Sequence, residues 1–131
     1  MRVVFDTNIF ISAFVIPGGR AEEAYLHVLK GDAALYTSVA ILTETAQKLK
    51  TKFGWKEGRV MRLLKAIAKV ATVLKTRVYL HVLTDEPDNR ILDCALKANA
   101  YVIVTGDKHL LTLQKCQNTS IVRLNDFLKM F

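Results

Sequence analysis

The chain alternates between short continuous apolar runs and longer segments in which apolar residues recur every three or four positions. The short runs predict β-strands at residues 2–6, 33–37, 77–82, 101–105 and 120–124. The longer segments predict α-helices at residues 7–15, 21–29, 39–52, 60–74, 90–100 and 126–131. Strands that alternate with helices favour a parallel α/β sheet with right-handed crossovers. We therefore expect a single α/β domain over residues 1–131.

Residues at the ends of several helices support this reading. Ser38 is a good N-cap for the helix after it, Gly31 follows the end of the second helix, and Asn125 precedes the last one. The segment 60–74 has the clearest helical pattern. Its apolar stripe consists of Val60, Leu63, Leu64, Ile67, Ala71 and Leu74.

Composition excludes several classes of protein. Half of the 131 residues are hydrophobic, which argues against disorder, and no apolar run approaches the roughly 20 residues of a membrane span. Cys94 and Cys116 lack the spacing of metal ligands, and the N-terminus shows no signal-peptide pattern. A reducing, cytoplasmic location without membrane contact is expected. The formal net charge of +7 suits nucleic acid or an acidic protein as partner, or simply a solvated basic surface.

Acidic residues follow the predicted strands at the points where α/β proteins bind ligands. Asp6 ends the first strand, Asp107 lies just beyond the fourth, and Glu44 is near the start of the helix after the second. Asp88 and Asp93 flank the start of the helix that precedes the fourth strand. Each acid alone is explained equally well by a turn or a helix cap. Together they predict carboxylates from four segments at one sheet edge.

Carboxylates brought close together repel one another unless a cation neutralises them. Oxygen ligands of this kind favour a hard divalent ion, Mg²⁺ or Mn²⁺. Such an ion polarises a phosphodiester and activates water, which explains how an acidic site serves a basic, nucleic-acid-binding protein.

The ordered motifs resemble those of PIN-domain ribonucleases, in particular the VapC-like toxins of prokaryotic toxin–antitoxin modules. The resemblance rests on "VVFDTNIFISA", "SVAILTETAQKL", "DNRILDCALKANAYVIVTGDKHLL" and "IVRLNDFL", and it covers nearly the whole chain. It implies a three-layer α/β/α domain around a mostly parallel sheet of about five strands. It also implies a metal-dependent endoribonuclease.

Carried over by position, the family's catalytic and metal-binding acids fall on Asp6, Glu44 and Asp107. Thr7 and Asn8 match the turn after the first acid, and Thr105 matches the hydroxyl residue before the last one. These three residues are expected to support the site.

The third acid departs from the common pattern, which places an aspartate at the position of Asn89. Asp93 lies one helical turn further on the same face and is the preferred catalytic and metal-binding replacement. Asp88 is then an outer or alternative ligand, and Asn89 supports the site.

Basic residues supply candidate RNA contacts. The main ones are Arg62, Lys65, Lys69 and Lys108, with Arg20 and Arg59 as further candidates. For each of them taken alone, a solvated surface is the better explanation. The histidines His27, His81 and His109 are interpreted as surface or packing residues.

The resemblance further implies a small antitoxin as partner and a possible homodimer. Apolar residues around Ile9, Phe10 and Tyr25 would serve as an interface or fill the core. The main alternative is a catalytically degenerate, nucleic-acid-binding PIN-like module, with Asn89 as the sign of lost activity. An aspartate-dependent phosphotransferase ranks lower, because Asn8 stands where a dehalogenase-type enzyme needs a second aspartate.

Overall fold

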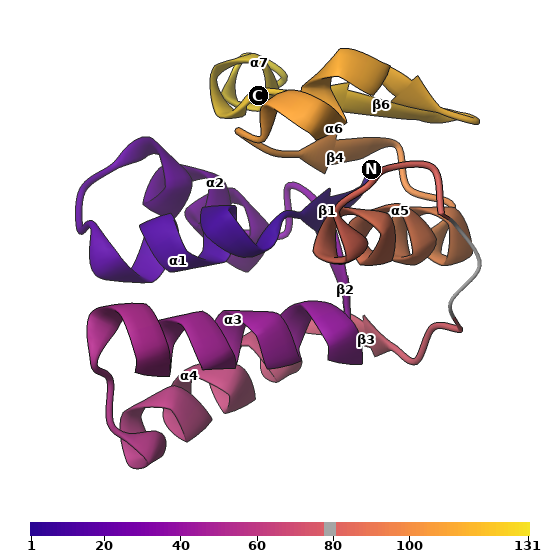
Figure 1. Ribbon diagram of the computed structural model, residues 1–131. Helices are drawn as coiled ribbons and strands as arrows, with labels where there is room; N and C mark the ends of the chain where they lie inside the picture. Colours follow the sequence, from indigo (N-terminus) through magenta and orange to yellow (C-terminus); the bar gives the residue numbers. More distant parts are fainter. Residues whose placement is uncertain (78–80) are drawn as a thin grey trace.

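The computed structural model describes residues 1–77 and 81–131 (Figure 1). Its strands are β1 (Arg2–Phe5), β2 (Ala34–Ser38), β3 (Ala71–Leu74), β4 (Val102–Val104), β5 (Lys115–Cys116) and β6 (Thr119–Val122). Its helices are α1 (Thr7–Val15), α2 (Arg20–Leu29), α3 (Val39–Phe53), α4 (Glu57–Val70), α5 (Glu86–Ala98), α6 (Lys108–Leu113) and α7 (Leu124–Leu128).

The strands form one sheet in the order β3-β2-β1-β4-β6-β5. All neighbouring pairs are parallel except β5 and β6. In Figure 1, α1 and α2 lie on one side of the central strand β1 and α5 lies on the other. The expected mostly parallel α/β sheet between helical layers is therefore confirmed, with the two-residue strand β5 as an addition.

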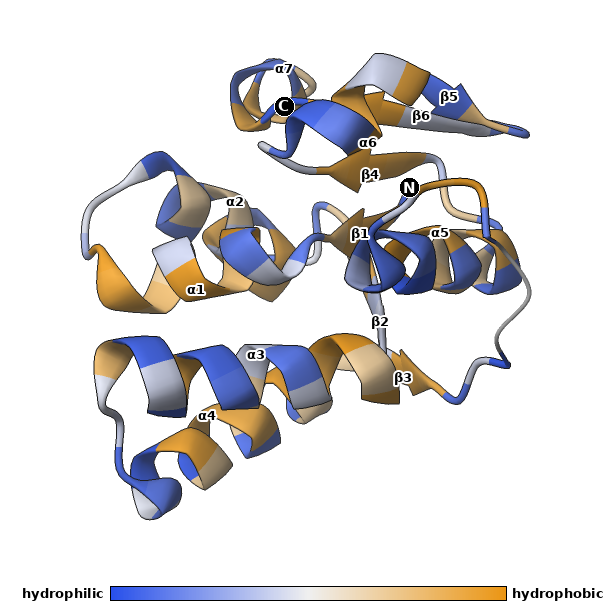
Figure 2. Ribbon diagram, in the orientation of Figure 1, coloured by the Kyte–Doolittle hydropathy of each residue, from blue (hydrophilic) through white to orange (hydrophobic). Residues whose placement is uncertain are grey.

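The central strands are buried on both faces because helices cover both sides of the sheet. Val3, Val4 and Phe5 of β1 have no exposed surface, and Figure 2 shows β1 and β4 as mostly hydrophobic. The Phe5 ring packs edge-on against Phe10 and Phe127, with centroids 5.7 and 5.8 Å apart. This core fixes the start of α1 against the end of β1.

The N-terminal apolar residues were expected either to form an interface or to fill the core. In the fold they are part of the core. Ile9, Phe10 and Tyr25 are 6%, 0% and 7% exposed, and Tyr25 packs against Phe14.

The predicted helix at 60–74 is too long, and its last residues form a strand instead. α4 ends at Val70, and Ala71 already has extended backbone angles. Thr72 and Val73 are β-branched and pair in parallel with β2. Ala71 and Leu74 match helical spacing by coincidence. The strand predicted at 77–82 falls partly outside the described residues, and the described residues 77, 81 and 82 are not in a strand.

Three smaller differences concern helix ends. α5 begins at Glu86 rather than at residue 90, because Asp85 caps it and Pro87 fits its first turn. α6 was not expected from the pattern. α7 is preceded by Arg123, whereas Asn125 accepts a hydrogen bond from the Arg20 guanidinium.

Across the described ranges 1–77 and 81–131, none of the helices has the length and apolar character needed to cross a membrane.

Candidate active site

Asp6 lies where β1 passes directly into α1. Its backbone occupies the N-cap position, but its side chain makes no capping hydrogen bond. Instead, Asp6 Oδ2 accepts a hydrogen bond of 2.6 Å from the Thr105 hydroxyl at the end of β4. β1 and β4 are parallel neighbours, so both side chains emerge at the same sheet edge.

Asp107 is joined to Asp6 through Thr105. The Thr105 hydroxyl oxygen accepts a hydrogen bond of 3.0 Å from the Asp107 backbone N–H while it donates to Asp6. Asp107 Oδ1 caps α6 by accepting from the backbone N–H groups of His109 and Leu110 at 2.8 and 3.1 Å. One hydroxyl group thus holds the Asp6 carboxylate and the backbone of Asp107.

Glu44 reaches the same edge from α3. The Thr7 hydroxyl donates to Glu44 Oε2 at 3.2 Å, and Lys48 Nζ lies 3.3 Å from Glu44 Oε1. Lys48 Nζ also donates to Asn8 Oδ1 at 3.4 Å. Lys48 was missed by the sequence reasoning, although its spacing of four residues from Glu44 is typical of a helical ion pair.

Burial and mutual repulsion perturb this group of acids. Burial raises the pKa of Asp6, and the charges of Asp107 and Glu44 raise it further. The hydrogen bond from Thr105 and the charge of Lys48 act in the opposite direction. Since the carboxylates of Asp107 and Glu44 both act on Asp6, the three acids share one electrostatic environment.

Asp88 joins them from the first turn of α5. Burial raises the pKa of Asp88 to about 7, together with the charges of Asp107, Asp85 and Asp6, while His109 lowers it. The side chain is almost buried, with 7% of its residue exposed. Its Oδ2 atom has no hydrogen-bond partner within residues 1–77 and 81–131. A buried carboxylate oxygen without a partner is costly, and a cation would satisfy it.

Asp93 forms an ion pair with Arg90 on the same helix. Its side chain has no exposed surface, and its Oδ2 atom lies 2.9 Å from Arg90 Nε. Arg90 also pairs with Glu86 at 3.1 Å. The packing therefore favours Asp88, and not the Asp93 preferred from sequence, as the carboxylate that faces Asp6 and Asp107.

Asn89, expected to support the site, does so through the backbone of the preceding loop. Its side chain pairs with both backbone groups of Leu83: Nδ2 donates to the carbonyl at 2.7 Å, and Oδ1 accepts from the N–H at 2.9 Å. Asn89 is completely buried. It fixes the loop before α5 and thereby the helix turn that carries Asp88.

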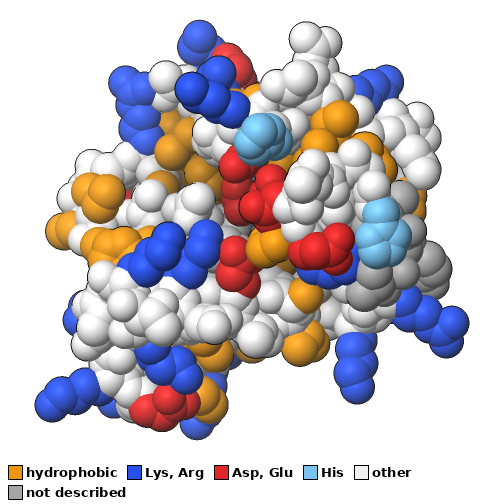
Figure 3. Space-filling model, viewed as in Figure 1, with side chains coloured by type: hydrophobic (Ala, Val, Ile, Leu, Met, Phe, Trp, Pro, Cys, Tyr) orange, Lys and Arg blue, Asp and Glu red, His pale blue; other side chains and the backbone are white. Residues whose placement is uncertain are grey.

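Viewed from outside, the acidic side chains gather in a central hollow that lysine, arginine and histidine side chains border (Figure 3). No three acidic, histidine or cysteine side chains in the described part of the chain already stand in a metal-coordinating arrangement. The donor set nevertheless fits a hard divalent cation, because it consists of carboxylate oxygens and includes the unsatisfied Oδ2 of Asp88.

The candidate RNA contacts lie in separate regions of the molecule. Lys108 starts α6 beside Asp107 and lies at the acidic edge. Arg62, Lys65 and Lys69 of α4 line a mostly apolar hollow of about 510 Å³, to which α1 and α2 contribute Phe14, Tyr25 and Leu29. Arg59 stacks over the Trp55 ring, 3.7 Å from its centroid.

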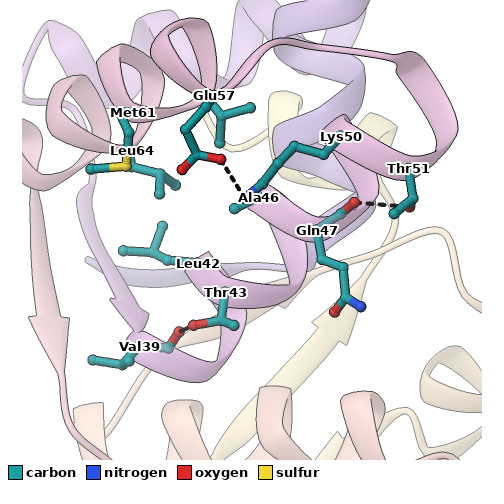
Figure 4. Close-up of a pocket in the computed structure, with 11 residues that line it drawn as sticks. Val39, Leu42, Thr43, Ala46, Gln47, Lys50, Thr51, Glu57, Met61 and Leu64 are labelled. Atoms are coloured by element: carbon teal, nitrogen blue, oxygen red, sulfur yellow. Dashed lines mark hydrogen bonds and ion pairs between the residues drawn. The ribbon is translucent and has the colours of Figure 1, made fainter.

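A larger, mostly apolar groove lies between α3 and α4. Its volume is about 610 Å³, and its lining includes Val39, Leu42, Met61 and Leu64 (Figure 4). The ion pair between Lys50 and Glu57 spans it at 2.9 Å. None of the candidate catalytic acids lines this groove.

Solved structures with a similar fold include two VapBC structures. VapBC2 from Rickettsia felis, bound to a DNA fragment from its promoter, matches with a TM-score of 0.65 and 14% identity over 94% of this chain and 98% of that chain. VapBC-1 from nontypeable Haemophilus influenzae matches with a TM-score of 0.64 and 16% identity over 95% and 99%. The PIN domain endonuclease Utp24 matches with a TM-score of 0.58 and 20% identity over 93% and 84%.

Sequence comparison agrees with the fold. "Uncharacterized protein MJ1680" of Methanocaldococcus jannaschii is 32% identical over 118 residues, which are 87% of this chain and 76% of the relative. The sequence profile of the PIN domain matches residues 2–109, a span that contains Asp6, Glu44 and Asp107. The chain therefore belongs to the PIN-domain family, and this membership supports nuclease activity.

Proposed function

We propose that this protein is an endoribonuclease that depends on Mg²⁺ or Mn²⁺ and hydrolyses RNA phosphodiester bonds. The observation that carries the proposal is the gathering of Asp6, Glu44, Asp88 and Asp107 at one edge of the sheet, where burial and mutual repulsion raise the pKa values of Asp6 and Asp88. A protein that only needed stability would not bring these charges together.

Asp6, Asp88, Asp107 and Glu44 would hold the cation, with Asp88 in the place first given to Asp93. When bound, such an ion polarises the phosphodiester and lowers the pKa of a water molecule. The unsatisfied oxygen of Asp88 supports this ligand set.

The neighbouring polar groups keep the carboxylates in position. Thr105 orients Asp6 and Asp107, and Thr7 orients Glu44. Lys48 balances part of the negative charge through Glu44 and Asn8. Lys108 lies next to Asp107 and is placed to attract an RNA phosphate.

A cleavage assay tests this function. Mixed single-stranded and structured RNAs are incubated with the protein in Mn²⁺, in Mg²⁺ and in a chelator. Cleavage is expected with either ion, and none in the chelator. RNA binding without cleavage under all conditions would contradict the nuclease and favour the degenerate binding module.

Metal binding is measured separately from activity. Mn²⁺ at a hundred times its Kd is expected to stabilise the fold by about 2.7 kcal/mol, because the ion binds only the folded state. The thermal midpoint therefore rises with added Mn²⁺ in the wild type and rises little in Asp6→Asn. An equal rise in both proteins would place the ion elsewhere.

We further propose that the protein is the toxin of a toxin–antitoxin pair, with a small antitoxin as partner and a homodimer as a possible assembly. The likeness in fold to the two VapBC structures supports this part of the proposal. Expression alone and together with the product of a neighbouring small reading frame tests it. Growth arrest that the second protein relieves is expected, and unaffected growth in both cases would count against a toxin.

A further inference from the structure

A second hollow lies directly beside the acidic edge, and the proposed function does not use it. It has a volume of about 470 Å³ and is lined by Val82, Leu83, Thr84, Asp85 and His109. This volume is within the range of small-ligand sites, which start at roughly 300 Å³. The lining combines an aromatic ring, aliphatic side chains and polar groups.

The hollow is tied to the acids by hydrogen bonds. The His109 backbone N–H donates to Asp107 Oδ1 at 2.8 Å, and the Asp88 backbone N–H donates to Asp85 Oδ1 at 3.3 Å. Two of its lining residues are thus bonded to two of the proposed cation ligands. A nucleotide seated here would have its phosphate close to the acidic edge.

Its wall is also held in place. Leu83 is fixed through both backbone groups by the buried side chain of Asn89. This pairing explains why an amide suits position 89 better than a carboxylate: a carboxylate has no N–H to donate to the Leu83 carbonyl. A wall with a fixed backbone is what a recognition pocket requires.

The side chains that line this hollow are accessible to a ligand. Thr84 and Asp85 are exposed, and the His109 ring lies close enough to Asp88 to lower its pKa. His109 is exposed, and Val82 is 55% exposed. Imidazole rings stack on unpaired RNA bases, and aliphatic groups cover the base plane.

We infer that this hollow binds one unpaired base of the RNA substrate, stacked on the His109 ring, with the base edge toward Thr84 and Asp85. The inference rests on the proposed ribonuclease function and adds to it a binding site for one unpaired base. Double-stranded RNA would not bind in this way, because its bases are stacked within the helix.

Binding in a chelator tests the pocket without cleavage. Fluorescence anisotropy gives the Kd of a short labelled single-stranded RNA and of a series in which each position in turn is abasic. In the wild type, one abasic position is expected to raise Kd by about tenfold to a hundredfold more than the other positions do. His109→Ala should raise Kd for the intact RNA by a similar factor and should no longer distinguish that position.

Two further variants sharpen the result. His109→Phe keeps a ring and is expected to retain the wild-type abasic profile. His81→Ala is the matched control, since His81 is exposed, pairs with Glu86 at 3.5 Å and does not line the hollow. The base pocket would be overturned if His109→Ala kept the wild-type abasic profile, or if His109→Phe lost it.

The outcome separates the two proposals. Metal-dependent cleavage by the wild type, with an abasic profile that does not depend on His109, would leave the nuclease standing and remove the pocket. An abasic profile that depends on His109, without any cleavage, would support the pocket and contradict the nuclease.

Discussion

The acidic edge and the α3–α4 groove are built on opposite principles. The edge collects Asp6, Glu44, Asp88 and Asp107 from segments far apart in the chain, and the fold keeps these carboxylates close despite their repulsion. The groove joins two consecutive helices and is lined mainly by apolar side chains. Its volume of about 610 Å³ exceeds the 470 Å³ of the hollow beside the acidic edge, but it holds none of the candidate acids.

The difference teaches that volume is a poor guide to chemistry in this molecule. An apolar groove forms wherever two amphipathic helices meet imperfectly, at little cost in free energy. Buried like charges, in contrast, work against folding and persist only where something else requires them. We therefore expect changes at the edge to affect activity, and changes in the groove to affect other properties.

The largest expected effect is the loss of RNA cleavage in Asp6→Asn and Asp107→Asn. Even outer-shell partners of metal ligands are worth about 10- to 100-fold, so removal of a ligand charge should reduce cleavage by at least about a hundredfold. Cleavage rates in Mn²⁺ measure this. Met61→Ser in the groove is the control and should cleave RNA at the wild-type rate. A loss of cleavage of equal size in Met61→Ser would contradict the difference between the two regions.

The next effect distinguishes the two candidate third acids. Asp88→Asn is expected to reduce cleavage nearly as much as Asp6→Asn. Asp93→Asn breaks the pair with Arg90 and should mainly lower the thermal midpoint. Cleavage and thermal unfolding are measured for both. A larger activity loss in Asp93→Asn than in Asp88→Asn would return the role to Asp93.

A smaller effect concerns stability and pH. The pKa of Asp88 is raised from 3.8 to about 7 in the fold. Between these values the unfolded chain has released a proton that the folded chain retains, so this carboxyl group makes the fold less stable as pH rises through the window. Asp88→Asn removes this penalty, and its thermal midpoint should exceed that of the wild type by about 3–8 °C at pH 8.

Thermal unfolding in a chelator at several pH values measures this difference. The gap between Asp88→Asn and the wild type should grow from pH 4 to pH 7 and then level off. Val39→Thr in the groove serves as the control, with an offset that does not change with pH. A difference in thermal midpoint between Asp88→Asn and the wild type that stays constant across this range would show that the fold does not raise the pKa of Asp88.

The smallest effect tests the two lysines of α4 that line the 510 Å³ hollow. Removal of both charges in Lys65→Gln/Lys69→Gln should reduce the slope of log K against log salt by about 1.4, if each lysine neutralises one phosphate of single-stranded RNA. Binding at several salt concentrations in a chelator measures the slope. An unchanged slope would make these lysines part of a solvated surface.

Sequence alone was sufficient for the parts of the fold that strong patterns encode. The buried strands β1 and β4, the N-cap Ser38 and the sheet edge that carries Asp6 and Asp107 follow from apolar runs and their polar ends. β3 was missed because Ala71 and Leu74 happen to continue a helical stripe. Strand pairing with β2 decided the structure of that segment.

The two candidate third acids, Asp88 and Asp93, differ in how they relate to the start of α5. The pattern placed its start at residue 90, which made Asp93 the acid nearest the helix start on the face of Asn89. The cap supplied by Asp85 adds a turn, so Asp88 enters the helix at the acidic edge. The pairing of Asn89 with Leu83 is a tertiary contact that spacing along the chain does not reveal.

The cap that Asp107 provides for α6 has a spectroscopic consequence. One oxygen of this carboxylate already accepts the amide protons of His109 and Leu110. Any ion drawn to the carboxylate withdraws electron density from those two bonds. The amide resonances of His109 and Leu110 should therefore shift during a Mg²⁺ titration and serve as built-in reporters of occupancy.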